Sequence, residues 1–222
     1  MARSEVPRKA AALAVDLVLP LVVLGFAWGS PRAFYAHPVR AIAVVLFVLP
    51  TLAMVFFTSG FAAHARRSRE RWGYLVALNV VANLSLIVAV YLEGHGIGIL
   101  PGGEVLRWTG LALLAAGTIL RAGTMLELGS RFTLTVSAQE HHRLETTGFY
   151  SRVRHPSYLG LVLISLGVAG VFRSGFWLAL LPLMLAGMIL RIRTEERFLL
   201  EQLGEEYRAY MARTARLLPG VY

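Results

Sequence analysis

Residues 148–160, with the sequence GFYSRVRHPSYLG, gather several side chains that can bind a charged ligand. Pro156 lacks an N–H group and disfavours helical angles at the preceding residue, so we expect a helix to begin at Pro156. Four polar residues then lie at the mouth of this helix, beside the unsatisfied N–H groups of its first turn: Arg154, His155, Ser157 and Tyr158. Helix N-termini attract anionic or strongly polar groups. A positively charged anchor at a membrane boundary is the alternative interpretation of the same residues.

The C-terminal segment, residues 191–220, is a second group of polar residues with a regular spacing. Arg191 and Glu195 are four residues apart and therefore share one face of a helix. Apolar residues recur every four positions further along: Leu199, Leu203, Tyr207 and Met211. This spacing predicts an amphipathic helix that lies against the protein or the bilayer surface. Taken alone, Arg191 and Glu195 are also consistent with an ion pair where a helix leaves the membrane.

The composition of the 222-residue chain is that of an integral membrane protein. Hydrophobic residues make up 56% and charged residues 16% of the chain, and the mean hydropathy is +0.61. Since the sequence has no cysteine, disulfides, thiolate metal sites and cysteine nucleophiles are excluded. The formal charge of +9 comes from arginines in the gaps between apolar runs, which indicates membrane orientation and not nucleic-acid binding.

Six apolar runs are candidates to position the two polar groups: 10–28, 39–63, 72–92, 105–125, 158–172 and 176–192. We therefore expect an all-α, polytopic transmembrane helical bundle of about six spans, followed by a C-terminal cytoplasmic amphipathic helix. The glycine-rich stretch 93–103 predicts a turn between the third and fourth runs. Residues 156–172 are only about 25 Å long as a helix, so they barely cross a bilayer or form a tight hairpin with the sixth run.

Small residues in the last two runs predict close packing between the two helices of this hairpin. They are Gly160, Gly167 and Gly170 on the first helix and Ala179, Ala186 and Gly187 on the second.

The distribution of arginine and lysine predicts the orientation of the bundle. With an inner N-terminus and six spans, eighteen basic residues fall in inner segments and four in outer ones. Cytoplasmic loops of membrane proteins carry such an excess. Both termini and both polar groups are therefore expected on the cytoplasmic side, where the two groups can meet. The chain divides into N-terminal transmembrane helices without a motif (1–125), expected on the substrate side, and a core that carries both groups (126–222).

Together, HHRLETTGFYSRVRHPSYLG and RIRTEERFLLEQLGEEYRAYMARTARLLPG resemble the membrane methyltransferases of the isoprenylcysteine carboxyl methyltransferase type. That family's pattern is roughly HxLVxxGxYxxxRHPxYxG, two apolar helices, then RxxxEExxLxxxFGxxYxxYxxxVxRxxP. The resemblance covers residues 131–219, and the joint spacing of the two motifs is its most specific feature. The chain departs from the pattern at Glu145, at Leu203 and at residues 214–216.

The resemblance implies that S-adenosylmethionine is the cofactor, held between the 148–160 stretch, the hairpin and the C-terminal segment. The cofactor contacts that it implies are His142, Arg143, Leu144, Glu145, Tyr150, His155, Pro156, Ser157, Tyr158 and Glu195. It implies Arg191 at the methyl acceptor. Arg154 joins Arg191 among the expected catalytic residues, since its charge and the helix N-terminus suit a carboxylate.

Methyl transfer from a sulfonium requires little beyond the positioning of the nucleophile and the methyl carbon. A carboxylate acceptor is ionised at neutral pH and needs no general base, whereas an amine acceptor needs one. The expected acceptor is a lipophilic molecule that enters from the bilayer, such as a prenylated cysteine carboxylate; a phospholipid amine and a small thiol stay open. His141 and His142 have no further His, Cys or clustered acidic neighbours in the sequence, so no metal is expected.

Two other protein classes fit part of this pattern. A sterol-reductase-like NADPH enzyme has a similar terminal hairpin and tyrosine-rich tail, but that class usually carries Asn where this chain has Ser157, and its chains are longer. A non-catalytic membrane scaffold that keeps the motif for packing is the third class.

Polar residues inside the apolar runs have two interpretations each. Asn79 and Asn83 share one helical face, which predicts hydrogen bonds between helices or, alternatively, a polar lining of the substrate site. Arg121, near the inner end of the fourth run, is expected to extend its charge toward the membrane surface or to close the cofactor site.

Overall fold

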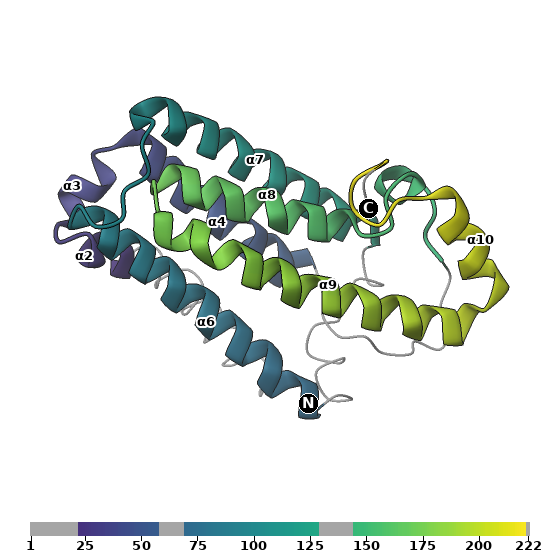
Figure 1. The fold of residues 1–222 in the computed structure, drawn as a ribbon. Coiled ribbons are helices and arrows are strands. Elements are labelled where there is room, and N and C mark those ends of the chain that lie inside the picture. The colour runs from purple at the N-terminus through teal and green to yellow at the C-terminus, as the bar shows by residue number, and fades with distance from the viewer. Residues whose placement is uncertain (1–21, 58–68, 129–143, 221–222) are drawn as a thin grey trace.

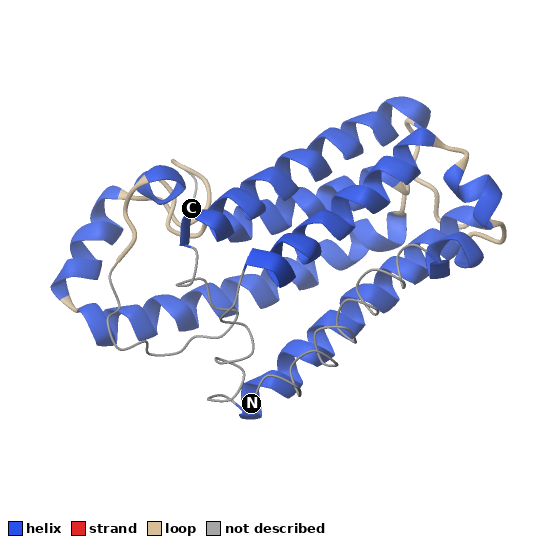
Figure 2. Cartoon of the chain, turned by 180° about the vertical axis from the view of Figure 1, so that it is seen from behind, coloured by secondary structure: helices blue, strands red, loops and turns tan. Residues whose placement is uncertain are grey.

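The computed structural model describes residues 22–57, 69–128 and 144–220. These residues are mostly helical (Figures 1 and 2), which confirms the all-α class. The elements are α2 (Leu24–Ala27), α3 (Pro31–Tyr35), α4 (Pro38–Phe57), α6 (Arg69–Gly94), α7 (Gly103–Leu128), the 3-10 helix η4 (Gly148–Ser151), α8 (Pro156–Val171), α9 (Gly175–Leu203) and α10 (Glu205–Arg213).

Local sequence signals begin several of these helices. Ser30 accepts a hydrogen bond from Ala33 N at 3.3 Å at the start of α3, and Ser174 accepts one from Trp177 N at 3.2 Å at the start of α9. α8 begins at Pro156, as predicted. No side chain caps α8, and the N–H groups of Tyr158 and Leu159 donate to the backbone oxygen of His155.

α8 packs mainly against α7, and its contact with α9, for which the sequence predicts close packing, is smaller. A Cβ atom on Gly117 of α7 would lie 2.6 Å from Gly160 O, and one on Gly167 of α8 would lie 2.5 Å from Leu114 N. Real Cβ contacts are longer, so glycine is what lets the two backbones touch. On α9, a Cβ at Gly187 would meet no atom within 4 Å. The prediction that the small residues of α8 and α9 pack together is therefore wrong, although a short turn does join the two helices.

The hydrophobic core lies at the end of the bundle where α2 and α3 meet the other helices (Figure 1). Its members include Leu24, Phe34, Val39, Val44, Leu86, Val90, Leu114, Val168, Phe172 and Trp177. Two arginines are buried at the same end: Arg107 pairs with Glu93, and the guanidinium of Arg40 lies 3.7 Å above the ring of Trp28. This end fixes α4, α6, α7 and α8 to one another.

Two helices, α7 and α9, are long and apolar enough to cross a membrane. Shorter apolar helical segments accompany them: Pro38–Phe47, Val80–Gly94 and Pro156–Val171. α6 lies beside the bundle at the α2–α3 end and diverges from α9 toward its own N-terminus (Figure 1). The run predicted at 10–28 lies mostly outside the described residues, so the count of six spans stays a prediction.

The C-terminal segment forms two helices, where the sequence predicts one amphipathic helix. α9 continues without a break from its apolar part to Leu203. Gly204, at φ +54°, ends α9, because this left-handed conformation is adopted readily by glycine. α10 follows as a separate short helix, and the chain after it returns toward the start of α8 (Figure 1).

Candidate active site

The loop before α8 pairs directly with the C-terminal segment. Arg154 N donates to Ala215 O at 2.8 Å, and His155 N donates to Arg216 O at 3.1 Å. A parallel β-bridge joins Val153 to Ala215. The fold therefore brings together the two polar groups that the sequence places far apart.

Glu196, on the polar C-terminal part of α9, is the centre of a buried ion network. Its Oε1 accepts from Arg154 Nε at 2.9 Å, and its Oε2 accepts from Arg216 Nε at 2.8 Å. His155 Nε2 lies 3.4 Å from Oε1. Only 3% of Glu196 is exposed. We call these four residues, Arg154, His155, Glu196 and Arg216, the tail group.

The tail group keeps Glu196 ionised and ties the chain end to the bundle. Burial alone would raise the pKa of the Glu196 carboxyl, but hydrogen bonds from His155 and Arg154 outweigh burial and lower the pKa to about 2. Arg154 Nη1 also donates to Met211 O at 3.0 Å and to Thr214 O. One guanidinium thus links α9, α10 and the segment after α10.

Two buried tyrosines of α10 complete this contact. Tyr207 and Tyr210 are 1% and 3% exposed. Tyr210 OH donates to Tyr150 O at 2.7 Å, which ties α10 to η4. Burial raises the pKa of Tyr210 to about 12, so its hydroxyl remains a proton donor at neutral pH.

Tyr158, in the first turn of α8, lies between two charged residues of α9. Arg191 Nε donates to Tyr158 OH at 2.6 Å, and Tyr158 OH donates to Glu195 Oε2 at 3.0 Å. The rings of His155 and Tyr158 meet edge to face, with centroids 5.6 Å apart. This contact makes the residues around Tyr158 direct neighbours of the tail group.

Arg121 of α7 reaches the same helix mouth. Its Nη1 donates to Ser157 Oγ at 3.0 Å, so the guanidinium is directed at the N-terminus of α8, and its extension toward the membrane surface stays a prediction. Its ionisable neighbours are Tyr158, Arg191 and Tyr150. We call five residues, Arg121, Ser157, Tyr158, Arg191 and Glu195, the Tyr158 group.

Glu127, near the end of α7, holds η4 in place. Its Oε2 accepts from Phe149 N at 3.2 Å. Gly148 has φ +48°, and a Cβ at this position would overlap the Glu127 carboxylate. Glycine at 148 therefore suits both the positive φ and the bond between Glu127 and Phe149 N, and η4 places Tyr150 against α10.

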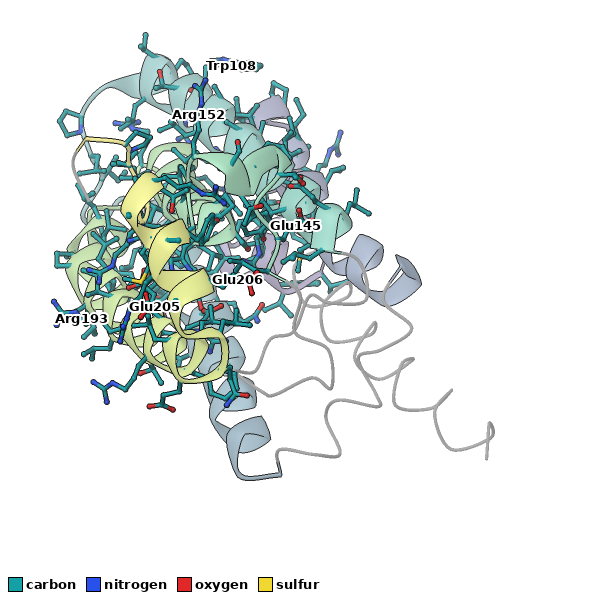
Figure 3. The ribbon with its side chains drawn as sticks, turned by 90° about the vertical axis from the view of Figure 1, so that its right-hand side faces the viewer. Trp108, Glu145, Arg152, Arg193, Glu205 and Glu206 are labelled. Carbon is teal, nitrogen blue, oxygen red and sulfur yellow. The ribbon has the colours of Figure 1, made fainter. Side chains whose placement is uncertain are left out.

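Most of the predicted site residues lie around the N-terminus of α8: Tyr150, Arg154, His155, Pro156, Ser157, Tyr158, Arg191 and Glu195. Leu144 and Glu145 belong to the loop before η4, where Glu145 Oε1 accepts from Thr147 N at 3.2 Å. Figure 3 shows Glu145 on one side of α10 and Arg193 at the opposite edge of the molecule. His142 and Arg143 lie outside the described residues.

Sequence reasoning misses Glu196, Arg216 and Tyr210 as members of the site. The pair Glu195-Glu196 was a usable signal, because adjacent helical residues point to different faces and so serve different partners. Tyr210 and Arg216 stand at the second tyrosine and at the arginine of the YxxYxxxVxRxxP pattern, which was the usable signal for both. In the described part of the chain, no three His, Cys, Asp or Glu side chains gather as a metal site.

Comparison with known proteins shows which family this chain is similar to. Residues 109–201 match the family model described as the isoprenylcysteine carboxyl methyltransferase (ICMT) family. The protein-S-isoprenylcysteine O-methyltransferase of Schizosaccharomyces pombe is 31% identical over 119 residues, which are 52% of this chain and 50% of the relative. The protein-S-isoprenylcysteine O-methyltransferase B of Arabidopsis thaliana is 28% identical over 181 residues, 77% of this chain and 91% of the relative. The match thus spans half the length of the first relative and most of the second.

A solved structure has a related fold. It is described as the eukaryotic intramembrane Ras methyltransferase ICMT, and it matches 96% of this chain and 75% of its own length with a TM-score of 0.59 at 23% identity. The family model covers the whole Tyr158 group as well as Arg154, His155 and Glu196, and it ends before Arg216. The family model and the curated relatives thus show that residues 109–201 are similar to the isoprenylcysteine carboxyl methyltransferase family, and the solved structure shows a related fold.

Proposed function

We propose that this chain is an integral membrane methyltransferase that uses S-adenosylmethionine and methylates the carboxylate of a lipophilic acceptor, such as a prenylated cysteine. The observation that carries the proposal is the convergence of Arg191, Tyr158 and Glu195 at the N-terminus of α8. The relatives supply the reaction, since those named above are protein-S-isoprenylcysteine O-methyltransferases.

The donor and acceptor set at the α8 N-terminus fits the cofactor. In the first turn of α8, Pro156 lacks an N–H group and those of Tyr158 and Leu159 donate to His155 O, so the Ser157 N–H group is the one that suits a carboxylate. The Glu195 carboxylate suits an ammonium group or ribose hydroxyls, and the rings of Tyr150 and Tyr158 suit adenine or a sulfonium. When bound, the cofactor supplies an electrophilic methyl group on a positively charged sulfur.

The chain's own residues hold and orient the acceptor. Arg191 is positioned by Tyr158 OH, which accepts from its Nε at 2.6 Å. A guanidinium in this place suits the acceptor's carboxylate, which is already ionised at neutral pH and so needs no base. The apolar α8 and α9 would exclude water from the reacting groups.

We assign Arg154 a positioning role, although the sequence suggests a catalytic one. Its guanidinium is engaged by Glu196 and by carbonyl groups of the tail. Arg154 therefore fixes the tail against the loop before α8, and Arg191 remains the residue expected at the acceptor.

The protein is proposed to cross the membrane several times, with both termini and the active site in the cytoplasm. Because the chain has no cysteine, single cysteines report this orientation directly. Glu206→Cys on α10 and Ile97→Cys at the other end of the bundle are both at exposed positions. An impermeant thiol reagent added from the cytoplasmic side should label Glu206→Cys and spare Ile97→Cys. The reverse pattern would refute this orientation.

Transfer of a labelled methyl group tests the proposed reaction. The acceptors are a farnesyl-cysteine analogue and a total membrane-lipid extract, which separate a prenylcysteine carboxylate from a phospholipid acceptor. A small thiol is included as a third acceptor, which tests thiol methylation. Oxidation of NADPH, followed by absorbance, tests the reductase alternative. We expect the labelled methyl group to be transferred to the farnesyl-cysteine analogue. Oxidation of NADPH without transfer of the label would contradict the proposal.

A matched pair of variants locates the reaction at the Tyr158 group. Glu195→Gln should reduce label transfer roughly tenfold to a hundredfold, because hydrogen bonds to charged groups contribute on this scale. Glu201→Gln removes the same charge at an exposed position of the same helix and should leave the rate unchanged. Equal rates for the two variants would place the chemistry elsewhere.

A further inference from the structure

Arg121 is placed by close helix packing at the mouth of α8. A Cβ atom on Gly160 would lie 3.1 Å from Arg121 Cβ, so glycine at 160 allows the α7 backbone to approach. From there, Arg121 Nη1 donates to Ser157 Oγ at 3.0 Å. The side chain is partly buried and directed at the turn where α8 begins.

The positive charge of Arg121 has no counter-charge among residues 22–57, 69–128 and 144–220. The charged or ionisable groups around it are Tyr158, Tyr150 and a second cation, Arg191. Its bonded partner there, Ser157, is neutral. A hydroxyl satisfies one donor but leaves the charge uncompensated, and a cation removed from water without an anion is costly.

Two other buried arginine side chains have carboxylate partners: Arg154 pairs with Glu196, and Arg107 pairs with Glu93. A third, Arg40, donates to backbone carbonyls and lies over the Trp28 ring. Arg121 differs from the first two at the place where a ligand is expected to bind.

We propose that Arg121 binds a carboxylate of the ligand that occupies the Tyr158 group, so that the ligand supplies the missing negative charge. The proposal rests on the proposed function and adds a binding residue contributed by α7. Two ligands carry such a carboxylate: the amino-acid end of the cofactor and the methyl acceptor. Both present the same chemistry to a guanidinium, which binds carboxylates through charge-assisted hydrogen bonds.

Binding of matched ligand pairs tests the proposal on the full-length protein in detergent. The first pair is S-adenosylhomocysteine and its carboxamide, and the second is a farnesyl-cysteine analogue and its carboxamide. Calorimetry gives Kd for each, so activity is not needed as a readout. The wild-type protein should prefer the carboxylate over the amide by about tenfold or more in one pair, as expected for a charge-assisted bond.

Substitutions then assign the preference to Arg121. Arg121→Gln keeps a donor for Ser157 but removes the charge, and it should reduce the carboxylate preference to less than about threefold. Arg193→Gln is the control, since Arg193 is exposed and projects from the edge of the molecule (Figure 3). It should keep the wild-type preference.

The outcomes separate the two ligand sources. Loss of preference in the S-adenosylhomocysteine pair assigns Arg121 to the cofactor, and loss in the farnesyl-cysteine pair assigns it to the acceptor. An unchanged preference in Arg121→Gln, or no preference in the wild type, overturns the proposal. If Arg121→Gln does not fold, Arg121→Lys replaces it. This variant should lower the preference at least threefold, since lysine lacks the planar fork, and no change would again overturn the proposal.

Failure of this inference is distinct from failure of the proposed function. A wild-type protein that binds neither S-adenosylhomocysteine nor the farnesyl-cysteine analogue contradicts the proposed function itself. A wild-type protein that binds them, with Arg121→Gln behaving like the wild type, contradicts only the role of Arg121.

Discussion

Two arginines lie near the α8 N-terminus, and they differ in what they contact. Arg154, in the tail group, bonds to the Glu196 carboxylate and to the tail carbonyls. Arg121, in the Tyr158 group, bonds to the Ser157 hydroxyl. A charge that is fully compensated inside the protein stabilises the fold, whereas a charge left without a counter-ion is available to a ligand. We therefore assign the tail group to positioning and the Tyr158 group to binding.

The far end of the bundle supports this distinction. Glu93 and Arg107 form a buried ion pair there, surrounded by the hydrophobic core. Like the tail group, this pair joins separate elements, here α6 and α7. Arg107 and Arg154 thus each connect elements through a carboxylate, whereas Arg121 bonds to the Ser157 hydroxyl.

The largest expected effect comes from breaking the tail group. Glu196→Ala leaves Arg154, His155 and Arg216 without their common carboxylate. Removing one partner of a buried ion pair costs roughly 3–5 kcal/mol, so we expect a clearly lower Tm in detergent. Limited proteolysis should also cut the chain after Gly204, because the tail is no longer held.

A control with the same loss of charge keeps this test specific. Glu201→Ala, at an exposed site on α9, should change the Tm little. Equal unfolding temperatures for Glu196→Ala and the wild type would contradict the assignment of the tail group to positioning.

The second prediction moves α7 and leaves the tail group untouched. A Cβ on Gly117 would lie 2.6 Å from Gly160 O and 2.7 Å from Ile164 N. Gly117→Ala should therefore force α7 away from α8 and reduce the free energy of unfolding by about 1–3 kcal/mol. It should also weaken binding of S-adenosylhomocysteine, because Arg121 moves away from Ser157.

Gly187→Ala is the matched control for this helix contact. Since its Cβ would point into open space, alanine should stabilise α9 by about 0.5–1 kcal/mol relative to glycine. Similar effects of the two substitutions would show that the α7–α8 contact does not position Arg121.

The sequence predicts where α8 begins, but it does not predict which helix α8 packs against. Proline has local rules, so the start of α8 at Pro156 is predictable. The choice of α7 as the partner of α8 is harder, because small residues also occur on α9. Gly110 and Gly117 do have the same seven-residue spacing as Gly160 and Gly167, and this match was the usable signal.

The tail group shows why the rest of the site is hidden from the sequence. Glu196 bonds to Arg154, 42 residues earlier, and to Arg216, 20 residues later. These contacts require the turn at Gly204 and the return of the chain after α10. A periodic apolar pattern predicts helix faces, but it does not say where a helix stops or which way the chain then runs.

A third prediction concerns the hydroxyl at the centre of the Tyr158 group. Tyr158→Phe keeps the ring but removes the group between Arg191 and Glu195. We expect methyl transfer to fall about tenfold, with stability reduced by only about 0.5–1.5 kcal/mol, since one partly buried hydroxyl is lost. A large drop in Tm with normal turnover would reverse the roles assigned to the two groups.

The smallest expected effect is the pH dependence of stability that Glu196 causes. Only part of the pH range over which Glu196 titrates is accessible to the folded protein. The pKa of Glu196 is about 2 in the folded protein, below its ordinary value of 4.5. Between these values the unfolded chain binds a proton that the folded chain does not, so stability falls as the pH is lowered from about 5 toward 2. Glu196→Gln lacks this group. Its Tm should therefore lie below that of the wild type at pH 6, and the difference should narrow as the pH falls to 3. Parallel Tm curves for the two proteins over this range would show that Glu196 is not held ionised by Arg154, His155 and Arg216.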